Sequence, residues 1–187
     1  MFEAWRQLLF KWNKAINLVS ARSLEGFWQR HALDSWQLVT HIPASTETVI
    51  DLGAGAGFPG LAIAIAFRER GRGQVSLVEA AGKKANFLRT VARELELPVE
   101  VRNVRVETLT PKPYDLVTAR AFAPLPRLFE FTERFWAPQT LGLFPKGETA
   151  KAEIAAAREI WTFSVDIHPS RSSETGKLLA IRDLARI

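Results

Sequence analysis

The segment that decides the fold reads Asp51-Leu52-Gly53-Ala54-Gly55-Ala56-Gly57-Phe58-Pro59-Gly60. It follows a short β-rich run, Thr48–Leu52, and leads into a helical pattern over Phe58–Arg70. Glycines at a strand-to-helix turn let the backbone approach a ligand closely, and the helix N-terminus offers free N–H groups. In open parallel sheets, ligands bind outside the carboxyl ends of the strands. The segment therefore predicts a cofactor loop rather than an empty turn.

Two cofactors fit this loop by pattern. The stretch from Gly55 to Gly60 matches the dinucleotide pattern G-x-G-x-x-G, whereas Asp51 followed by Gly53, Gly55 and Gly57 matches the E/D-x-G-x-G-x-G motif of class I methyltransferases. Either cofactor needs an acid after the second strand to accept hydrogen bonds from ribose hydroxyls, and Glu79 stands there. We favour S-adenosyl-L-methionine because Asp51 can reach its cationic methionyl end. A nicotinamide-dependent oxidoreductase is the alternative, although no second domain is evident to hold its substrate.

Beyond the loop, strands alternate with helices. The predicted strands are Gln74–Val78, Val99–Val104, Tyr114–Thr118 and Thr140–Phe144, and the predicted helices are Lys83–Glu96, Pro124–Trp136 and Glu148–Ile160. Two last strands, Thr162–His168 and Lys177–Arg182, flank a turn and predict an antiparallel hairpin. Alternation of this kind predicts βαβ units with right-handed crossovers.

The first 45 residues predict a helical cap. Apolar residues at three- and four-residue spacing indicate one helix over Phe2–Ile16 and a second over Gly26–His41. We therefore expect one α/β domain over 1–187, with the cap at 1–45 and a Rossmann-like cofactor-binding sheet at 46–187. That sheet is predicted to be the mostly parallel, seven-stranded sheet of class I methyltransferases, with an antiparallel C-terminal hairpin.

Composition narrows the class of protein. Of 187 residues, 47% are hydrophobic and 24% charged, which is typical of a soluble globular domain. The net charge of +5 favours a polyanionic partner such as nucleic acid. Cysteine is absent, which excludes disulfides, thiolate metal sites and cysteine nucleophiles, and no metal is expected. No apolar run approaches the roughly 20 residues of a membrane span, and the start lacks signal-peptide features, so we expect a cytoplasmic protein.

Several motifs resemble one family, the ribosomal RNA small subunit methyltransferase G family, also called glucose-inhibited division protein B. In chain order they are Lys11–Leu18, Arg30–Ser35, the glycine segment 51–60, Glu79–Lys84 with Phe87 and Leu88, Arg105–Glu107, Arg120–Ala123 and Lys146–Gly147. The resemblance covers nearly the whole chain. It implies methyl transfer from S-adenosyl-L-methionine to N7 of guanine 527 in the 530 loop of 16S ribosomal RNA. The implied partner is the small ribosomal subunit, and we expect the chain to be a monomer.

The resemblance also implies site residues. Carried over by position, it places cofactor contacts at Gly53, Phe58, Val106, Glu107 and Arg120, in addition to the contacts expected at Asp51, Gly55, Gly57 and Glu79. The chain departs from the family in three ways. It lacks part of the N-terminal helical region of longer members, it has Phe144-Pro145 before Lys146, and Glu79 stands where other members carry Asp.

The expected methyl transfer needs alignment of the methyl donor with the acceptor nitrogen rather than a general base. Guanine N7 has a free lone pair and no proton to lose, so an in-line displacement suffices. Arg120 and Lys146 are the predicted positioning groups, because Arg can hold a carboxylate or phosphate bidentately. A structural ion pair is the alternative for Arg120, and a solvated turn lysine is the alternative for Lys146. A catalytically idle RNA-binding assembly factor is the alternative for the whole chain.

Other residues are expected to be structural. His31 and Asp34 are three apart, so they share one helix face and predict a bridge between the cap and the cofactor domain. Phe58 is predicted either to cover the cofactor or to pack under the loop. The tryptophans of the cap are predicted to lie in the core rather than to stack on bases; they are Trp5, Trp12, Trp28 and Trp36.

Overall fold

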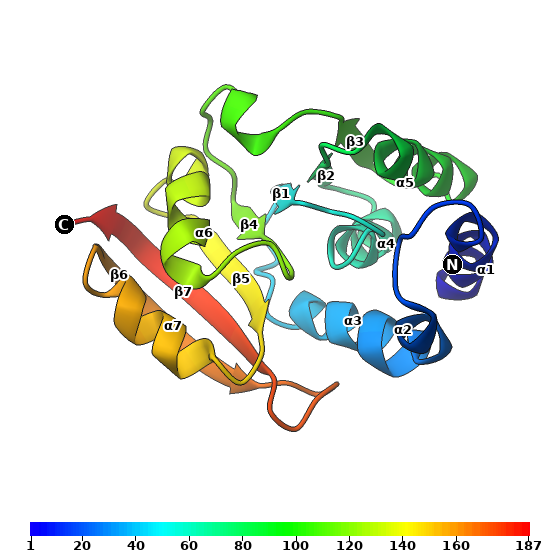
Figure 1. Cartoon of the computed structure of the whole chain (residues 1–187). Helices are drawn as coiled ribbons and strands as arrows, with labels where there is room; N and C mark the ends of the chain where they lie inside the picture. Colours follow the sequence, from blue (N-terminus) through cyan, green and yellow to red (C-terminus); the bar gives the residue numbers. More distant parts are fainter.

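Seven strands form one sheet in the order β3-β2-β1-β4-β5-β7-β6 in a computed structural model that describes residues 1–187 (Figure 1). The strands are β1 (Thr48–Leu52), β2 (Gln74–Val78), β3 (Val99–Arg102), β4 (Leu116–Thr118), β5 (Leu141–Lys146), β6 (Trp161–Pro169) and β7 (Lys177–Arg186). The first five pair in parallel, and β7 runs antiparallel to both β5 and β6. The predicted mostly parallel sheet with a C-terminal hairpin is confirmed.

Helices cover both faces of the sheet. Those that follow strands are α4 (Gly60–Arg70), α5 (Gly82–Glu94), α6 (Leu125–Thr132) and α7 (Ala150–Ala157), and the cap contributes α1 (Phe2–Asn13), α2 (Ala21–Glu25) and α3 (Asp34–Val39). The chain also forms two short 3₁₀ helices, η2 (Val106–Thr108) and η3 (Glu133–Phe135). In Figure 1, the cap with α4 and α5 lies on one side of the sheet, and α6 and α7 lie on the other.

Each face of the sheet has its own hydrophobic core. One core joins the cap to α4, α5 and alternate strand residues such as Val49 and Leu77. The other joins α6 and α7 to the strand residues that point the opposite way, such as Ile50 and Val78. Helix α4 is buried from Gly60 to Ile65 and at Phe67, because the sheet lies on one side of it and the cap on the other. The cap is therefore an integral part of the first core.

The helix predicted over Gly26–His41 is continuous from Phe27 to Val39, but it is not regular. Its first part is a π-helix, η1 (Phe27–Leu33), which continues directly into α3. A π-helix is rare and is commonly found at functional sites. Trp28, which lies in η1, is 53% exposed, so the prediction that Trp28 lies in the core is wrong. The core position predicted for Trp5 is confirmed, since that residue is fully buried.

Element ends differ from the predictions where side chains or loops intervene. Helix α1 ends at Asn13 rather than Ile16 because the Asn13 side chain accepts hydrogen bonds from the backbone N–H groups of Leu18 and Val19. Helix α4 begins at Gly60 rather than Phe58 because the Asp51 carboxylate accepts the Gly60 N–H. None of the helices has the length and apolar composition needed to cross a membrane.

Candidate functional site

The glycine loop after β1 has an open face at Gly55. Gly53, Gly55 and Gly57 have φ angles of 69°, 54° and 95°, in the left-handed region that favours glycine. A Cβ on Gly53 would lie 2.5 Å from Cδ2 of Phe122, and one on Gly57 would lie 2.2 Å from Cδ1 of Leu61. At Gly55 the nearest atom to such a Cβ is the Gly53 carbonyl oxygen, 3.7 Å away. A ligand can therefore approach the backbone closely at Gly55.

Glu79 follows β2 and ties its end to the glycine loop. Its Oε2 accepts a hydrogen bond from the Gly55 N–H at 2.9 Å, and its Oε1 accepts one from the Ala81 N–H at 2.8 Å. The side-chain amide of Asn103 donates to the Glu79 carbonyl oxygen at 2.8 Å. Each carboxylate oxygen keeps a further acceptor position. The carboxylate is thus fixed beside the loop and can still accept hydrogen bonds from ribose hydroxyls.

Asp51 lies directly beneath the loop, fully buried. Its Oδ2 accepts the Gly60 N–H at 2.9 Å, while its Oδ1 has no partner. Burial raises the pKa of Asp51 to about 7, although the hydrogen bond from Gly60 and the charge of Arg120 oppose the rise. A buried oxygen without a partner is unfavourable. The cationic end of S-adenosyl-L-methionine would supply that partner, directly or through water, so the residues present fit this cofactor.

Arg120 follows β4 and joins the cap to the sheet. Its Nη1 donates to Oδ2 of Asp34 at 3.0 Å and to the carbonyl oxygen of Arg30 at 3.2 Å. Its Nη2 lies 3.1 Å from Nδ1 of His31, and its guanidinium carbon lies 4.8 Å from the centroid of the Phe58 ring. His31 and Asp34 therefore both contact Arg120 and form the predicted bridge between the cap and the cofactor domain. The pairing with Asp34 is also the ion pair that the sequence offered as the alternative for Arg120.

His31 is a neutral acceptor in this network. A guanidinium has no lone pair to offer, so the Nδ1 of His31 must accept from Arg120 and its Nε2 must carry the proton. That Nε2 donates to the hydroxyl of Ser23. Burial, followed by the positive charge of Arg120, lowers the pKa of His31 to about 4. The residue is thus uncharged near neutral pH, which preserves its hydrogen bond from Arg120.

The ring of Phe58 packs under the loop. It stacks on Trp5 with centroids 4.4 Å apart and on His31 with centroids 4.5 Å apart, and the residue is 3% exposed. Of the two positions predicted for this ring, the structure has the one that packs against the cap. The backbone of Phe58 remains part of the loop.

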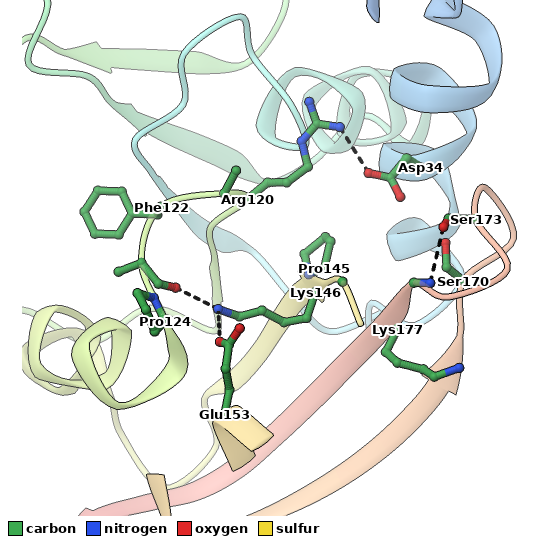
Figure 2. A pocket seen from close by; sticks show the side chains of 14 residues that line it. Asp34, Arg120, Phe122, Pro124, Pro145, Lys146, Glu153, Ser170, Ser173 and Lys177 are labelled. Carbon is green, nitrogen blue, oxygen red and sulfur yellow. Dashed lines mark hydrogen bonds and ion pairs between the residues drawn. The ribbon is translucent and has the colours of Figure 1, made fainter. Parts of the chain in front are cut away.

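A cavity of about 560 Å³ opens at the carboxyl ends of β4 and β5, next to Arg120 (Figure 2). Its walls come from α3, the segment after β4, the end of β5, α7 and the loop between β6 and β7. The lining residues are Asp34, Arg120, Ala121, Phe122, Ala123, Pro124, Pro145, Lys146, Gly147, Glu153, Ser170, Ser173, Gly176 and Lys177. The two predicted positioning residues, Arg120 and Lys146, thus line one cavity.

Lys146 is not a solvated turn lysine. Its side chain is 10% exposed, and its Nζ donates to the carbonyl oxygen of Ala123 at 2.7 Å and to Oε2 of Glu153 at 2.8 Å. The same Glu153 oxygen accepts the N–H of Leu125 at 2.8 Å, and Oε1 accepts the hydroxyl of Thr149. Burial opposes the charged form of Glu153, but these hydrogen bonds together hold its pKa below the usual value. The pair connects β5, α7 and the start of α6.

Val106 and Glu107 lie in a different place. They form η2 after β3 and line a second cavity of about 230 Å³ with residues of α6 and η3, namely Arg127, Glu130, Phe131 and Arg134. Nη1 of Arg134 donates to the Glu107 carbonyl oxygen at 2.8 Å. The structure therefore does not bring Val106 and Glu107 into the cavity that Arg120 lines.

Sequence reasoning missed two residues at the larger cavity. Phe122 was visible in the motif Arg120–Ala123, but nothing in the pattern assigned it a role. Glu153 lies in an alanine-rich helix, and no spacing links it to Lys146 or to the start of α6. Only the tertiary arrangement shows that Phe122 lines the cavity and that Glu153 pairs with Lys146.

Comparison with known proteins identifies the family. The model of the family described as rRNA small subunit methyltransferase G matches residues 1–178. The chain belongs to the ribosomal RNA small subunit methyltransferase G family. A relative of that name from Parvibaculum lavamentivorans is 46% identical over 183 residues, which cover 97% of this chain and 81% of the relative. Another, from Caulobacter vibrioides, is 41% identical over 98% of this chain and 84% of its own length.

Solved structures with little sequence identity share the fold. The structure of M. jannaschii TYW2 in complex with AdoMet aligns with a TM-score of 0.64 at 13% identity, over 93% of this chain and 80% of that one. A mutant of MtNAS in complex with S-adenosylmethionine aligns with a TM-score of 0.62 at 14% identity, over 94% and 72% of the two chains. These likenesses support the Rossmann-like methyltransferase fold predicted from the sequence.

Membership of the methyltransferase G family decides between the two cofactors that the glycine loop allowed. The chain is an S-adenosylmethionine-dependent methyltransferase, and the nicotinamide-dependent alternative is set aside. The fixed carboxylate of Glu79, the open backbone at Gly55 and the unpartnered oxygen of Asp51 are consistent with that cofactor.

Proposed function

We propose that this methyltransferase transfers a methyl group from S-adenosyl-L-methionine to N7 of guanine 527 in the 530 loop of 16S ribosomal RNA. The observation that carries the proposal is identity of 41–46% over nearly the whole chain to proteins named ribosomal RNA small subunit methyltransferase G. In this proposal the substrate is the small ribosomal subunit, which suits a net charge of +5. The enzyme acts in the cytoplasm as a monomer of one domain, 1–187.

In this proposal, each group of site residues contacts a different part of the cofactor. Glu79 accepts hydrogen bonds from the ribose, and Oδ1 of Asp51 takes the cationic end of the methionyl group. Val106 and Glu107 lie beside the adenine. The backbone around Phe58 and the side chain of Arg120 complete the site with the loop glycines, which are Gly53, Gly55 and Gly57.

The larger cavity is the proposed entry for the guanine. Arg120 and Lys146 position the RNA there, since guanine N7 and O6 and the phosphates all accept hydrogen bonds. Lys146 uses two of its three ammonium protons on Ala123 and Glu153, which leaves one for the RNA. When bound, S-adenosyl-L-methionine supplies an electrophilic methyl group on a positively charged sulfur. The N7 lone pair forms the new bond as the methyl–sulfur bond breaks, and the positive charge passes to the guanine ring.

The cavity suits an acceptor that needs no general base. Its two carboxylates, Asp34 and Glu153, are each held in an ion pair, with Arg120 and Lys146 respectively. Neither is a free base poised to remove a proton. Because guanine N7 carries no proton, alignment of the two reactants supplies the acceleration.

The proposal is tested by transfer of labelled methyl from S-adenosyl-L-methionine to small subunits that lack the modification. We expect incorporation by the wild-type chain and at least a tenfold loss in Arg120→Ala. The matched control is Arg158→Ala, an exposed arginine that follows α7 and does not line the cavity, which should retain the wild-type rate. Cofactor binding without any incorporation by the wild-type chain would instead support the idle assembly factor.

A further inference from the structure

Phe122 lies between the glycine loop and the larger cavity. It lines the larger cavity, and its ring lies edge-to-face against Phe131, with centroids 5.3 Å apart and an interplanar angle of 81°. Phe131 in turn lines the smaller cavity. The ring of Phe122 also covers Gly53 so closely that a Cβ there would lie 2.5 Å from its Cδ2. Phe122 therefore touches both the cofactor loop and the place where an acceptor would enter.

The backbone on both sides of Phe122 is held in place. Ala121 has a φ of 51°, in the left-handed region that is unfavourable for alanine. Unfavourable backbone of this kind persists only where the surroundings enforce it, and it is concentrated at functional sites. On the other side, Lys146 donates to the carbonyl oxygen of Ala123, and Glu153 accepts the N–H of Leu125. These contacts fix the backbone at Phe122, and the contacts of its ring with Gly53 and Phe131 fix the direction of the side chain.

The chemistry of the larger cavity matches a nucleobase. Three cationic side chains line it, those of Arg120, Lys146 and Lys177, and Phe122 supplies its one aromatic ring. That residue is only half-buried, so part of its surface remains available to a ligand. Proteins that hold an unstacked base combine an aromatic face with hydrogen-bonding and cationic groups. The cavity has this combination at the carboxyl edge of the sheet.

We propose that Phe122 is the stacking surface for the acceptor guanine and holds the plane of the base between the glycine loop and Arg120. This inference rests on the proposed function, because it names the residue that receives the base in that reaction. A ring in this position fixes the orientation of the base, and hence the direction from which N7 meets the methyl group.

The test compares Phe122→Leu with Phe122→Tyr in the full chain. Leucine keeps an apolar side chain but has no π face, whereas tyrosine keeps the ring. Stacking on an aromatic side chain contributes enough to RNA binding that its loss should lower kcat/KM for small subunits by about 5- to 150-fold. We expect that loss in Phe122→Leu, with the Kd for S-adenosyl-L-methionine within about twofold of wild type, and near-normal turnover in Phe122→Tyr.

The matched control is Phe163→Leu. Phe163 is a half-buried aromatic residue on β6, edge-to-face with Phe129 at 5.0 Å, and lies outside the cavity. The Phe163→Leu variant loses a similar aromatic packing contact away from the cavity, so its kcat/KM should stay at the wild-type value. Should Phe122→Leu fail to fold, Phe122→Met fills similar space without a ring and gives the same comparison.

Two results would overturn the inference. One is wild-type kcat/KM in Phe122→Leu. The other is a loss of affinity for S-adenosyl-L-methionine that accounts for the whole loss of turnover, which would place the ring in the cofactor site instead. Failure of the proposed function is distinguishable from both, because in that case the wild-type chain itself would transfer no methyl to the subunits.

Discussion

Replacing Glu153 with alanine removes the carboxylate that ties α7 to β5 and to the start of α6. The Lys146 ammonium, whose side chain is only 10% exposed, would then lose its counter-charge, and the N–H of Leu125 would lose its acceptor. Removing one partner of a buried ion pair typically destabilises by about 3–5 kcal/mol. Glu153 is 17% exposed and Lys146 keeps the carbonyl of Ala123, so we expect about 2–3 kcal/mol.

The measurement is thermal and urea unfolding of the full chain, with Glu130→Ala as the control. Glu130 also lies on a helix and pairs with an Arg, but the side chains of Arg127 and Glu130 are 62% and 37% exposed. An exposed pair of this kind contributes at most about 1 kcal/mol. In a chain of this size, 2–3 kcal/mol corresponds to a fall in Tm of about 4–12 °C.

A double-mutant cycle separates the ion pair from general effects of truncation. Lys146→Met together with Glu153→Ala should destabilise less than the sum of the two single changes, because the double variant leaves no buried unpaired charge. Equal effects of Glu153→Ala and Glu130→Ala, or strict additivity in the cycle, would show that the Lys146–Glu153 pair does not stabilise the fold.

Three further predictions concern the loop and the cap. Folding lowers the pKa of His31 from 6.5 to about 4, so the unfolded chain binds an extra proton as the pH falls below 6.5. The free energy of unfolding should therefore fall by about 2 kcal/mol between pH 7 and pH 5. Urea titrations at the two pH values should show this fall, and a smaller one in His31→Gln. With its pKa near 7, Asp51 gains negative charge as pH rises, so calorimetry should find tighter S-adenosyl-L-methionine binding at pH 8 than at pH 6 and no such change in Asp51→Asn. Gly55→Ala and Gly71→Ala both place alanine at positive φ, so each should destabilise the folded chain by about 1–2 kcal/mol. Only Gly55→Ala should also weaken cofactor binding, because a ligand approaches the backbone there. Equal cofactor affinities of the two variants would contradict the open face assigned to Gly55.

Much of the sheet could be predicted because its signals are local. Apolar runs that end in turn residues mark the strands, and the glycine segment marks the crossover from β1 to α4. The position of Glu79 beside the loop followed from the rule that parallel strands end at one edge. These parts of the fold depend on the periodicity of apolar residues and on the direction of the strands, and both can be inferred from the sequence alone.

The parts that escaped prediction depend on contacts between distant segments. The π-helix that contains Trp28 forms the first part of the helix that ends at Val39, and nothing in the local sequence distinguishes it from a regular α-helix. Arg120 was predicted as a site residue, but its partners Asp34 and His31 lie more than 80 positions away. The contact of Phe122 with Gly53 is likewise created only when two strands of the sheet come together.

The identity of the nucleotide that this chain methylates tests the proposed activity most directly. Small subunits lacking the modification are incubated with the enzyme and labelled S-adenosyl-L-methionine, and the ribosomal RNA is digested and its fragments analysed by mass. We expect 7-methylguanosine at a single guanine of the 530 loop. A methyl group on an exocyclic amine, on a ribose, or on a nucleotide outside that loop would contradict it.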